Sequence, residues 1–224
     1  MSTKDPSHDV GNLSREILDY WFATIDDATP LDREKEPFRS CFARWYGKRP
    51  EIDAEIRERF EPALEAVTNQ GRDWERHVEE WRRVPDGLVA LTILLDQLPR
   101  NMYRDTAQMY AHDPLALIVA AQVLGEPDSD ARPLARRMFL LVPFMHVENV
   151  TLQQMMVARF EELVEDARTR SPGNVGFYEG ALDFARRHLT IVAEYGRFPH
   201  RNALLGRTST PAELELLRGG HAGF

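Results

Sequence analysis

Apolar residues recur at steps of three and four along most of the chain, which is the spacing of one buried face of an α-helix. One stripe runs from Ile52 to Val67. Another runs from Leu88 to Leu98, and Pro99 is predicted to stop that helix because proline cannot continue the backbone hydrogen bonds. We find no stretch in which apolar and polar residues alternate between hairpin turns, as they would in a strand. The pattern therefore predicts an all-α protein.

Start and stop signals mark the later helices. Asp113 is a capping residue followed by proline at the first helical position. The two longest helices are predicted over 148–168 and 175–195, the second ending at Gly196. Residues 210–213 read Thr-Pro-Ala-Glu, the pattern of a capping box before a short last helix. We therefore expect about nine or ten helices, packed as stacked antiparallel hairpins.

Length and composition favour a single folded domain. The chain has 224 residues, of which 43% are hydrophobic and 29% are charged, as in globular proteins that bury a core. We place the domain at 13–218. The polar residues 1–12 and the C-terminal residues 219–224 are predicted to be flexible tails.

Charge and hydropathy narrow the possible partners. The formal net charge of -8 repels phosphate backbones, and no run of basic residues offsets it, so we expect no nucleic acid partner. The longest apolar stretch, 138–145, is far shorter than the roughly 20 residues that span a bilayer, so we expect no membrane association. A polar N-terminus without a signal core and a lone Cys41 favour a cytoplasmic protein with no disulfide. The sequence leaves the oligomeric state open.

Polar residues crowd the corner that follows the stripe ending at Leu98. Arginine suits carboxylates and phosphates because its planar fork donates two parallel hydrogen bonds, and a neighbouring asparagine adds a further donor or acceptor. We therefore predict that this first corner helps to bind an anionic group. In a structural alternative, Asp96 pairs with Arg100 and the amides cap the broken helix end. The residues of the first corner are Asp96, Gln97, Arg100, Asn101 and Arg104.

A second corner repeats the Pro, Arg and Asn of the first further along the chain. Its cationic side chains would repel one another unless anions lie between them, and they precede a helix N-terminus whose unbonded N–H groups attract anions. In the alternative, Thr210 and Glu213 satisfy those N–H groups, and the arginines pair with acidic residues elsewhere. We expect the two corners to face each other around a cavity. The residues of the second corner are Arg197, His200, Arg201, Asn202 and Arg207.

His146 is the candidate catalytic acid or base. Imidazole titrates near neutral pH, and either Glu148 or Asp96 could orient it. On a regular helix, residues two apart point in different directions, so His146 and Glu148 converge only if the backbone is irregular after Pro143. A structural, hydrogen-bonded histidine is the alternative.

No metal site and no cofactor are expected. The spacings His-x-x-x-His and Glu-x-x-His of helical zinc or iron sites do not occur in the sequence, and no Gly-rich phosphate loop follows a strand pattern. Trp21 and Trp45 are predicted to pack in the core. They could also wall a pocket over the first corner, because an indole ring keeps a polar N–H at its rim.

Five segments resemble the DUF924 family, in order and along nearly the whole chain. They are ILDYWF (17–22), RWYGKRPEIDAEIRERF (44–60), LLDQLPRNMYR (94–104), FLLVPFMHVEN (139–149) and EYGRFPHRNALLGRTSTPAE (194–213). The resemblance implies a helical fold similar to tetratricopeptide-repeat superhelices, and it implies no established activity. The family usually has a serine and an acid after the histidine, whereas His146 is followed here by Val147 and Glu148. Attack by that serine hydroxyl is therefore not expected in this chain.

Three functions are compatible with these residues. The first is binding of a small anionic molecule or an acidic peptide terminus in a pocket lined by the arginines, asparagines and histidines of the two corners. The second is a cofactor-independent hydrolase, lyase or transferase that uses His146 as acid or base. The third is a tetratricopeptide-like module that grips a partner protein in a groove. We favour the first, and the sequence does not decide whether any reaction is catalysed.

Overall fold

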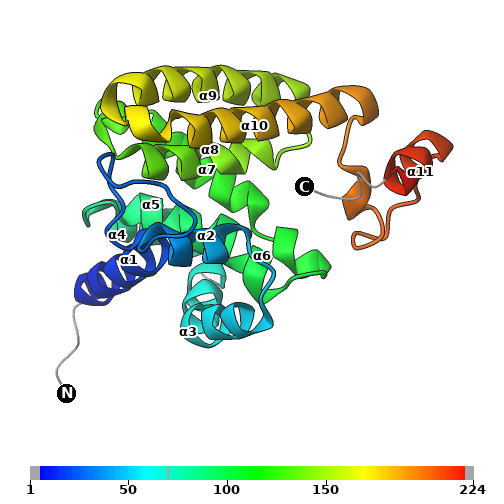
Figure 1. Cartoon of the computed structure of the whole chain (residues 1–224). Helices are drawn as coiled ribbons and strands as arrows, with labels where there is room; N and C mark the ends of the chain where they lie inside the picture. Colours follow the sequence, from blue (N-terminus) through cyan, green and yellow to red (C-terminus); the bar gives the residue numbers. More distant parts are fainter. Residues whose placement is uncertain (1–5, 70, 220–224) are drawn as a thin grey trace. The chain divides into compact units, whose positions relative to one another are not determined.

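The computed structural model describes residues 6–69 and 71–219, and Figure 1 shows the chain coloured along its sequence. Within those two ranges the regular structure is helical and no residue lies in a strand, which confirms the all-α prediction. None of the helices described is both long and apolar enough to cross a membrane. The chain forms two compact units. The tetratricopeptide-like superhelix and the single domain at 13–218 stay predictions.

Of the described residues, the first unit holds those between 6 and 104 together with 108–143, and the second holds 105–107 and 144–219. In the first unit, helix α3 (Pro50–Thr68) buries the predicted stripe, in which Ile56, Phe60 and Leu64 follow one another at steps of four. Two elements, η3 (Ala107–Tyr110) and α8 (Leu134–Met145), cross from one unit into the other. The remaining elements of the first unit are α1 (Pro6–Phe22), α2 (Phe38–Tyr46), η1 (Gly71–Asp73), α4 (Trp74–Arg82), α5 (Gly87–Thr92), η2 (Ile93–Gln97), α6 (Leu98–Met102), α7 (Asp113–Leu124) and η4 (Ser129–Ala131).

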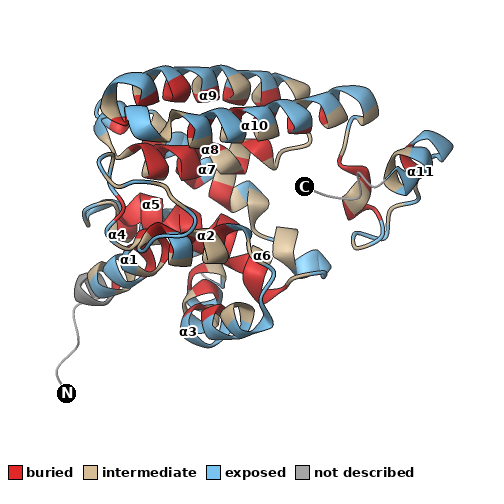
Figure 2. Cartoon of the chain, in the orientation of Figure 1, coloured by how far each residue is buried: buried red, intermediate tan, exposed pale blue. Residues whose placement is uncertain are grey.

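Helix α5 lies at the centre of the first unit. All six of its residues are buried, as the red ribbon in Figure 2 shows. It packs on α1, α4 and α7. Its sequence, Gly-Leu-Val-Ala-Leu-Thr, is nearly apolar on every side, which is typical of a helix that other elements enclose. Gly87 has no Cβ atom, so this helix can start against the carbonyl oxygen of Trp81, which a Cβ atom would overlap.

The predicted stop at Pro99 is wrong. The chain continues from α5 through a π-helical turn, η2, into α6, where Pro99 lies in the first turn. Proline is tolerated there because the N–H that it lacks is one that a helix start leaves unbonded, and the wider π turn makes room for its ring. The π turn also carries Asp96 and Gln97, which are both buried.

The second unit is built on a helical hairpin. Helices α9 (Val150–Arg170) and α10 (Val175–Tyr195) run side by side in Figure 1, joined by the 3₁₀ turn η5 (Pro172–Asn174), and they pack closely along their length. Gly196 ends α10 in the left-handed conformation that glycine adopts without strain, as predicted. The segment then passes through η6 (Pro199–Arg201) to α11 (Pro211–Arg218). The predicted capping box of Thr210 and Glu213 is confirmed at the start of α11.

One further boundary differs from the sequence pattern. Helix α1 begins at Pro6, ahead of the domain start placed at 13, and the flexibility of the two tails stays a prediction. Residues 6–12 are polar, but Pro6 suits a first helical turn and Val10 is buried. Residues 1–5 and 220–224 of the predicted tails lie outside the described residues. Pro143 lies inside α8, which continues to Met145.

The close approach at Gly87 yields a prediction about stability. We expect Gly87→Ala to lower the free energy of unfolding by about 1–3 kcal/mol or more, since the new methyl group overlaps the Trp81 carbonyl oxygen. Gly180→Ala in α10 is the matched control, because a Cβ atom there meets nothing within 4 Å. The control should gain up to about 0.5–1 kcal/mol from reduced backbone entropy of the unfolded chain. Urea unfolding of both variants measures the difference, and equal effects would contradict this account of the α5 start.

Candidate functional site

The first corner forms around a buried carboxylate. Asp96 accepts a hydrogen bond from the Gln97 amide and lies 3.6 Å from a guanidinium nitrogen of Arg100. Arg100 also donates two hydrogen bonds of 3.0 Å to Asp113 Oδ1. Burial acts to lower the pKa of Arg100, but the charges of Asp96 and Asp113 hold it above its ordinary value. Arg100 is thus shared between two carboxylates of its own unit.

Arg104 and Asn101 meet a third carboxylate, Asp53 in α3. The Arg104 fork donates to both oxygens of Asp53, at 2.7 and 2.8 Å, and the Asn101 amide donates to one of them at 2.9 Å. Arg104 also donates to the carbonyl oxygen of Gly47. Because α3 and α6 pack against each other, these bonds fasten the first corner to α3.

Trp21 and Trp45 lie in the core of the first unit, as their apolar character predicts. Both rings pack edge-on against Phe139, with ring centroids 5.6 and 4.8 Å away. The Trp45 indole N–H donates to the carbonyl oxygen of Trp21 at 2.9 Å. Their additional role as walls of a ligand pocket stays a prediction.

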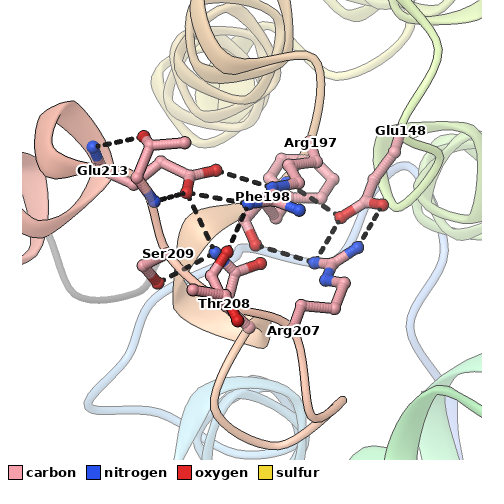
Figure 3. Close-up of polar contacts among 9 residues, drawn as sticks. Glu148, Arg197, Phe198, Arg207, Thr208, Ser209 and Glu213 are labelled. Carbon is pink, nitrogen blue, oxygen red and sulfur yellow. Dashed lines mark hydrogen bonds and ion pairs between the residues drawn. The ribbon is translucent and has the colours of Figure 1, made fainter.

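In the second unit, Arg207 and Glu148 form a bidentate pair, which Figure 3 shows. Two guanidinium nitrogens of Arg207 donate to separate oxygens of Glu148, at 2.7 and 2.9 Å. The Phe198 N–H donates to Glu148 at 2.8 Å, and the Phe198 carbonyl oxygen accepts from Arg207 at 3.1 Å. Burial acts to raise the pKa of Glu148, but the hydrogen bonds from Arg207 and Phe198 hold it below its ordinary value. Both Glu148 oxygens are engaged in this way, and a role in orienting His146 stays a prediction.

Glu213 is the second carboxylate of this network (Figure 3). Arg197 donates to its two oxygens at 2.6 and 2.8 Å, and the Asn202 amide donates to one of them at 3.3 Å. The Thr210 N–H donates to Glu213 at 2.6 Å as part of the capping box. Hydrogen bonding to Arg197 is the main cause that lowers the pKa of Glu213 to about 2. The N-terminus of α11 is therefore capped by a side chain of its own chain.

Phe198 is also the centre of a group of basic side chains. We define the Phe198 group as His188, His200 and Arg201. The Arg201 guanidinium carbon lies 4.5 Å from the centroid of the Phe198 ring, and the His188 and His200 rings lie 5.4 and 5.6 Å from it. His188 and Arg201 are buried, and His200 is partly buried. This group contains the second corner's predicted residues His200 and Arg201, and adds His188 from α10.

Both histidines of the Phe198 group are neutral at pH 7. Burial is the main cause that lowers the pKa of His188 to about 2, and the nearby His146, Arg201 and His200 lower it further. Burial, followed by the charge of Arg201, lowers the pKa of His200 to about 4. The His188 Nδ1–H donates to the carbonyl oxygen of Phe184 at 2.9 Å, which leaves Nε2 as an acceptor.

The backbone around His146 is held by Gln153 of α9. The Gln153 amide donates to the carbonyl oxygens of Met145 and Val147, at 2.6 and 2.9 Å, on the two sides of His146. Gln153 is completely buried. The backbone between α8 and α9 is irregular, and Gln153 holds it on both sides of His146.

Four of the five predicted arginines bind carboxylates of their own unit, which favours the structural alternative for them. Apart from the Asp96–Arg100 pair of the structural alternative, their partners were not predicted. Asp53 lies 51 positions before Arg104, and no local pattern connects the two. Glu213 was recognised as part of a capping box, and its spacing from Thr210 was the usable signal. The Gln153 amide donates to backbone carbonyl oxygens, which every residue has, so its partners could not be recognised from the sequence. The four arginines are Arg100, Arg104, Arg197 and Arg207.

The comparisons with known proteins agree on the fold. A family model described as a bacterial protein of unknown function, DUF924, matches residues 17–221. The chain belongs to the DUF924 family. A solved structure of a protein of unknown function from Agrobacterium tumefaciens is similar to it, with 30% sequence identity and a TM-score of 0.71, over 95% of this chain and 100% of that one. No curated protein matches the chain.

The DUF924 match confirms the family resemblance on which the helical fold was expected. It includes both corners, His146 and Gln153. Neither the family description nor the similar structure carries a function, so the chemistry of this DUF924 protein has to be inferred from its own side chains. The absence of a metal and a cofactor stays a prediction.

The Glu213 network yields a prediction about pH. The pKa of Glu213 is about 2 in the folded chain against an ordinary 4.5, so its contribution to stability is present above pH 4.5 and is lost as the pH falls towards 2. We expect Glu213→Gln to lower the urea midpoint at pH 7. The difference from wild type should shrink as the pH is lowered through that window. Glu215→Gln is the matched control, since Glu215 is exposed on the same helix and pairs only with Arg218 in the described chain.

A constant difference between wild type and Glu213→Gln from pH 7 to pH 2 would contradict the assigned ionisation of Glu213. A loss in Glu215→Gln as large as that in Glu213→Gln would show instead that α11 is sensitive to any change of charge.

Proposed function

We propose that this DUF924 protein binds a small phosphate- or carboxylate-bearing ligand at the Phe198 group of its second unit. The observation that carries the proposal is the gathering of His188, His200 and Arg201 around one buried aromatic ring. The chain as a whole has a net charge of -8, so these basic groups are a local exception. Burying them costs free energy, which a bound anion would offset.

The chemistry of the group suits an anion. Arginine keeps its charge at all accessible pH values, and its planar fork matches the oxygens of a carboxylate or phosphate. Stacking on the Phe198 ring restricts the orientation of Arg201, so less side-chain entropy is lost on binding. His200 adds a second donor. Burial and, after it, the charge of Arg201 lower its pKa, and a bound anion would raise that pKa and favour the charged form.

The ion pairs around the group support the same proposal. Arg207 and Arg197 hold Glu148 and Glu213 in bidentate pairs, which fasten the segment that carries Phe198. A ligand-binding segment in an otherwise irregular stretch requires this kind of support, because its geometry must be fixed before the ligand arrives. The role of these two arginines in the proposal is therefore to position the segment.

A second candidate function is a cofactor-independent enzyme with His146 as acid or base. One observation favours it: the Gln153 amide fixes the backbone on both sides of His146, as a catalytic group requires. The substrate would be the anion that the Phe198 group binds. Once a ligand is known, its conversion can be followed by NMR with wild type and His146→Asn. Conversion at equal rates by both proteins would exclude this role.

Thermal unfolding tests the binding proposal. We expect at least one member of a panel of inorganic phosphate, pyrophosphate, nucleotides and citrate to raise Tm, since a ligand at 100 times its Kd adds about 2.7 kcal/mol of stability. Arg201→Gln and His200→Asn should each abolish the shift, measured against the Tm of the same variant without ligand. Arg186→Gln should keep it, because Arg186 is an exposed residue of α10 that pairs with Glu161.

The proposal is contradicted if no member of the panel shifts Tm, or if Arg201→Gln responds as wild type does. A shift that disappears equally in Arg186→Gln would indicate nonspecific attraction to positive surface charge.

The pH dependence of affinity is a second test. An anion favours protonated His200, whose pKa is about 4 without ligand, so ligand binding takes up a proton. Affinity should therefore rise as the pH is lowered from 7 towards 4 and level off below that. Isothermal titration calorimetry in buffers of different ionisation enthalpy measures both the affinity and the proton uptake. His200→Asn should show neither the rise nor the uptake, and the reverse slope in wild type would contradict the assignment.

A further inference from the structure

A group of basic and aromatic side chains lies at the surface of the first unit, around the C-terminal end of α2. The guanidinium of Arg33 lies over the Phe42 ring, with its carbon 4.3 Å from the ring centroid. The Phe42 and Tyr46 rings are neighbours in turn, with centroids 4.9 Å apart. Lys48 and Arg49 follow Tyr46 along the chain, and both are exposed. We call these five residues the α2 patch.

The three cations of the α2 patch are not neutralised within the fold. They form no ion pair and no side-chain hydrogen bond with the residues that the structure describes. Residues 32–49 contain six basic and three acidic side chains, in a chain whose net charge is -8. Asp32 and Glu36 pair with basic residues outside the patch, which leaves Glu34 as the unpaired acid of this segment in the described chain. The α2 patch is therefore locally positive.

Tyr46 is packed against other rings but remains half exposed. Its ring contacts Phe42 on one side and lies edge-on to the buried Trp45, with centroids 6.3 Å apart. Even so, 50% of its surface is exposed, and its hydroxyl forms no hydrogen bond with the described residues. Tyrosine and arginine are enriched in protein–protein interfaces, because a stiff aromatic ring gives a large contact area at little cost in side-chain entropy.

The first corner fixes the turn that carries Lys48 and Arg49. Arg104 donates to the carbonyl oxygen of Gly47 at 3.2 Å and to Asp53 in the first turn of α3. Arg49 is the N-cap residue of α3, and its side chain forms no capping bond. The two cations are therefore carried by a backbone that is held in place before a partner arrives, which lowers the entropy cost of binding.

We propose that the α2 patch binds an acidic segment of another protein. The argument is charge complementarity: unpaired cations beside an exposed ring match a segment in which Asp or Glu flank an apolar residue. A single exposed ion pair contributes little in water, so the patch suits a segment that meets several cations and the ring together. A nucleic acid is a poorer match, because a chain of net charge -8 repels a long phosphate backbone. The proposal is independent of the Phe198 group.

Fluorescence anisotropy with labelled peptides tests the proposal. The probes are short fluorescein-labelled peptides in which Glu or Asp residues flank a central Phe or Leu. One control has lysine in place of the acidic residues, and a second probe is a labelled oligouridine RNA. We expect the acidic peptides to bind, less tightly as the salt concentration is raised, and the lysine peptide to fail.

Matched variants locate the binding surface. Lys48→Glu reverses an exposed charge of the patch and should weaken acidic peptide binding by about tenfold or more at low salt. Arg76→Glu on α4 is the control, because Arg76 is also exposed and forms no ion pair in the described chain. Both variants have the same net charge and should keep the wild-type Tm. Tyr46→Ser should weaken binding, whereas Tyr46→Phe should retain it, because the ring makes the contact.

Three outcomes would overturn the proposal: no acidic peptide binds, the lysine peptide binds equally well, or Lys48→Glu and Arg76→Glu bind the acidic peptides alike. Tighter binding of the RNA than of any acidic peptide, lost in Lys48→Glu, would also overturn it, since the partner would then be a nucleic acid. A concentration-dependent oligomer in light scattering that Lys48→Glu abolishes would assign the patch to a second copy of this chain instead.

Discussion

The pairing of a guanidinium fork with a carboxylate is the interaction on which both corners of this protein depend. Asp53 receives Arg104 and the Asn101 amide, and so fastens α6 to α3. Glu148 receives Arg207 together with the Phe198 N–H, and so fixes the irregular stretch that follows α10. Charges that have partly left water are costly unless matched, so each pair constrains the path of two distant segments. The polar clusters that stand out in the sequence therefore serve largely to join segments of the chain that are distant in sequence.

This constraint also separates two kinds of basic residue. Where an arginine forms a bidentate pair with a carboxylate, the pair holds two backbone segments together, and the carboxylate neutralises the charge of the arginine. Arg201 lies against the Phe198 ring, beside histidines whose pKa values burial and the neighbouring positive charges depress. These basic side chains lie together in a chain that has many acidic residues. The proposed anionic ligand would account for their clustering.

Local signals allowed much of the fold to be predicted, and non-local contacts limited the prediction of the site. Periodicity placed α3 and α10, and Gly196 and the Thr210 capping box marked true helix ends, because each depends on neighbours within one turn. The π turn before Pro99 could not be predicted from the sequence, since it depends on how other helices pack around residues 88–98. Apart from Asp96, which lies four residues before Arg100, the partners of these arginines lie farther away along the chain. Residue type therefore identified the donors but not which of those carboxylates they meet. His188 belongs to the Phe198 group only because Phe198 folds back on α10.

The central claim is that anions are bound by the Phe198 group and not by Arg197 and Arg207, whose forks hold Glu213 and Glu148. The most direct measurement is a titration of the ¹⁵N-labelled protein with pyrophosphate, followed through the imidazole and guanidinium resonances. The account predicts saturable shifts of His188, His200 and Arg201, with the Arg197 and Arg207 side chains changing little. Saturable shifts of Arg197 or Arg207 with unchanged histidines would contradict it.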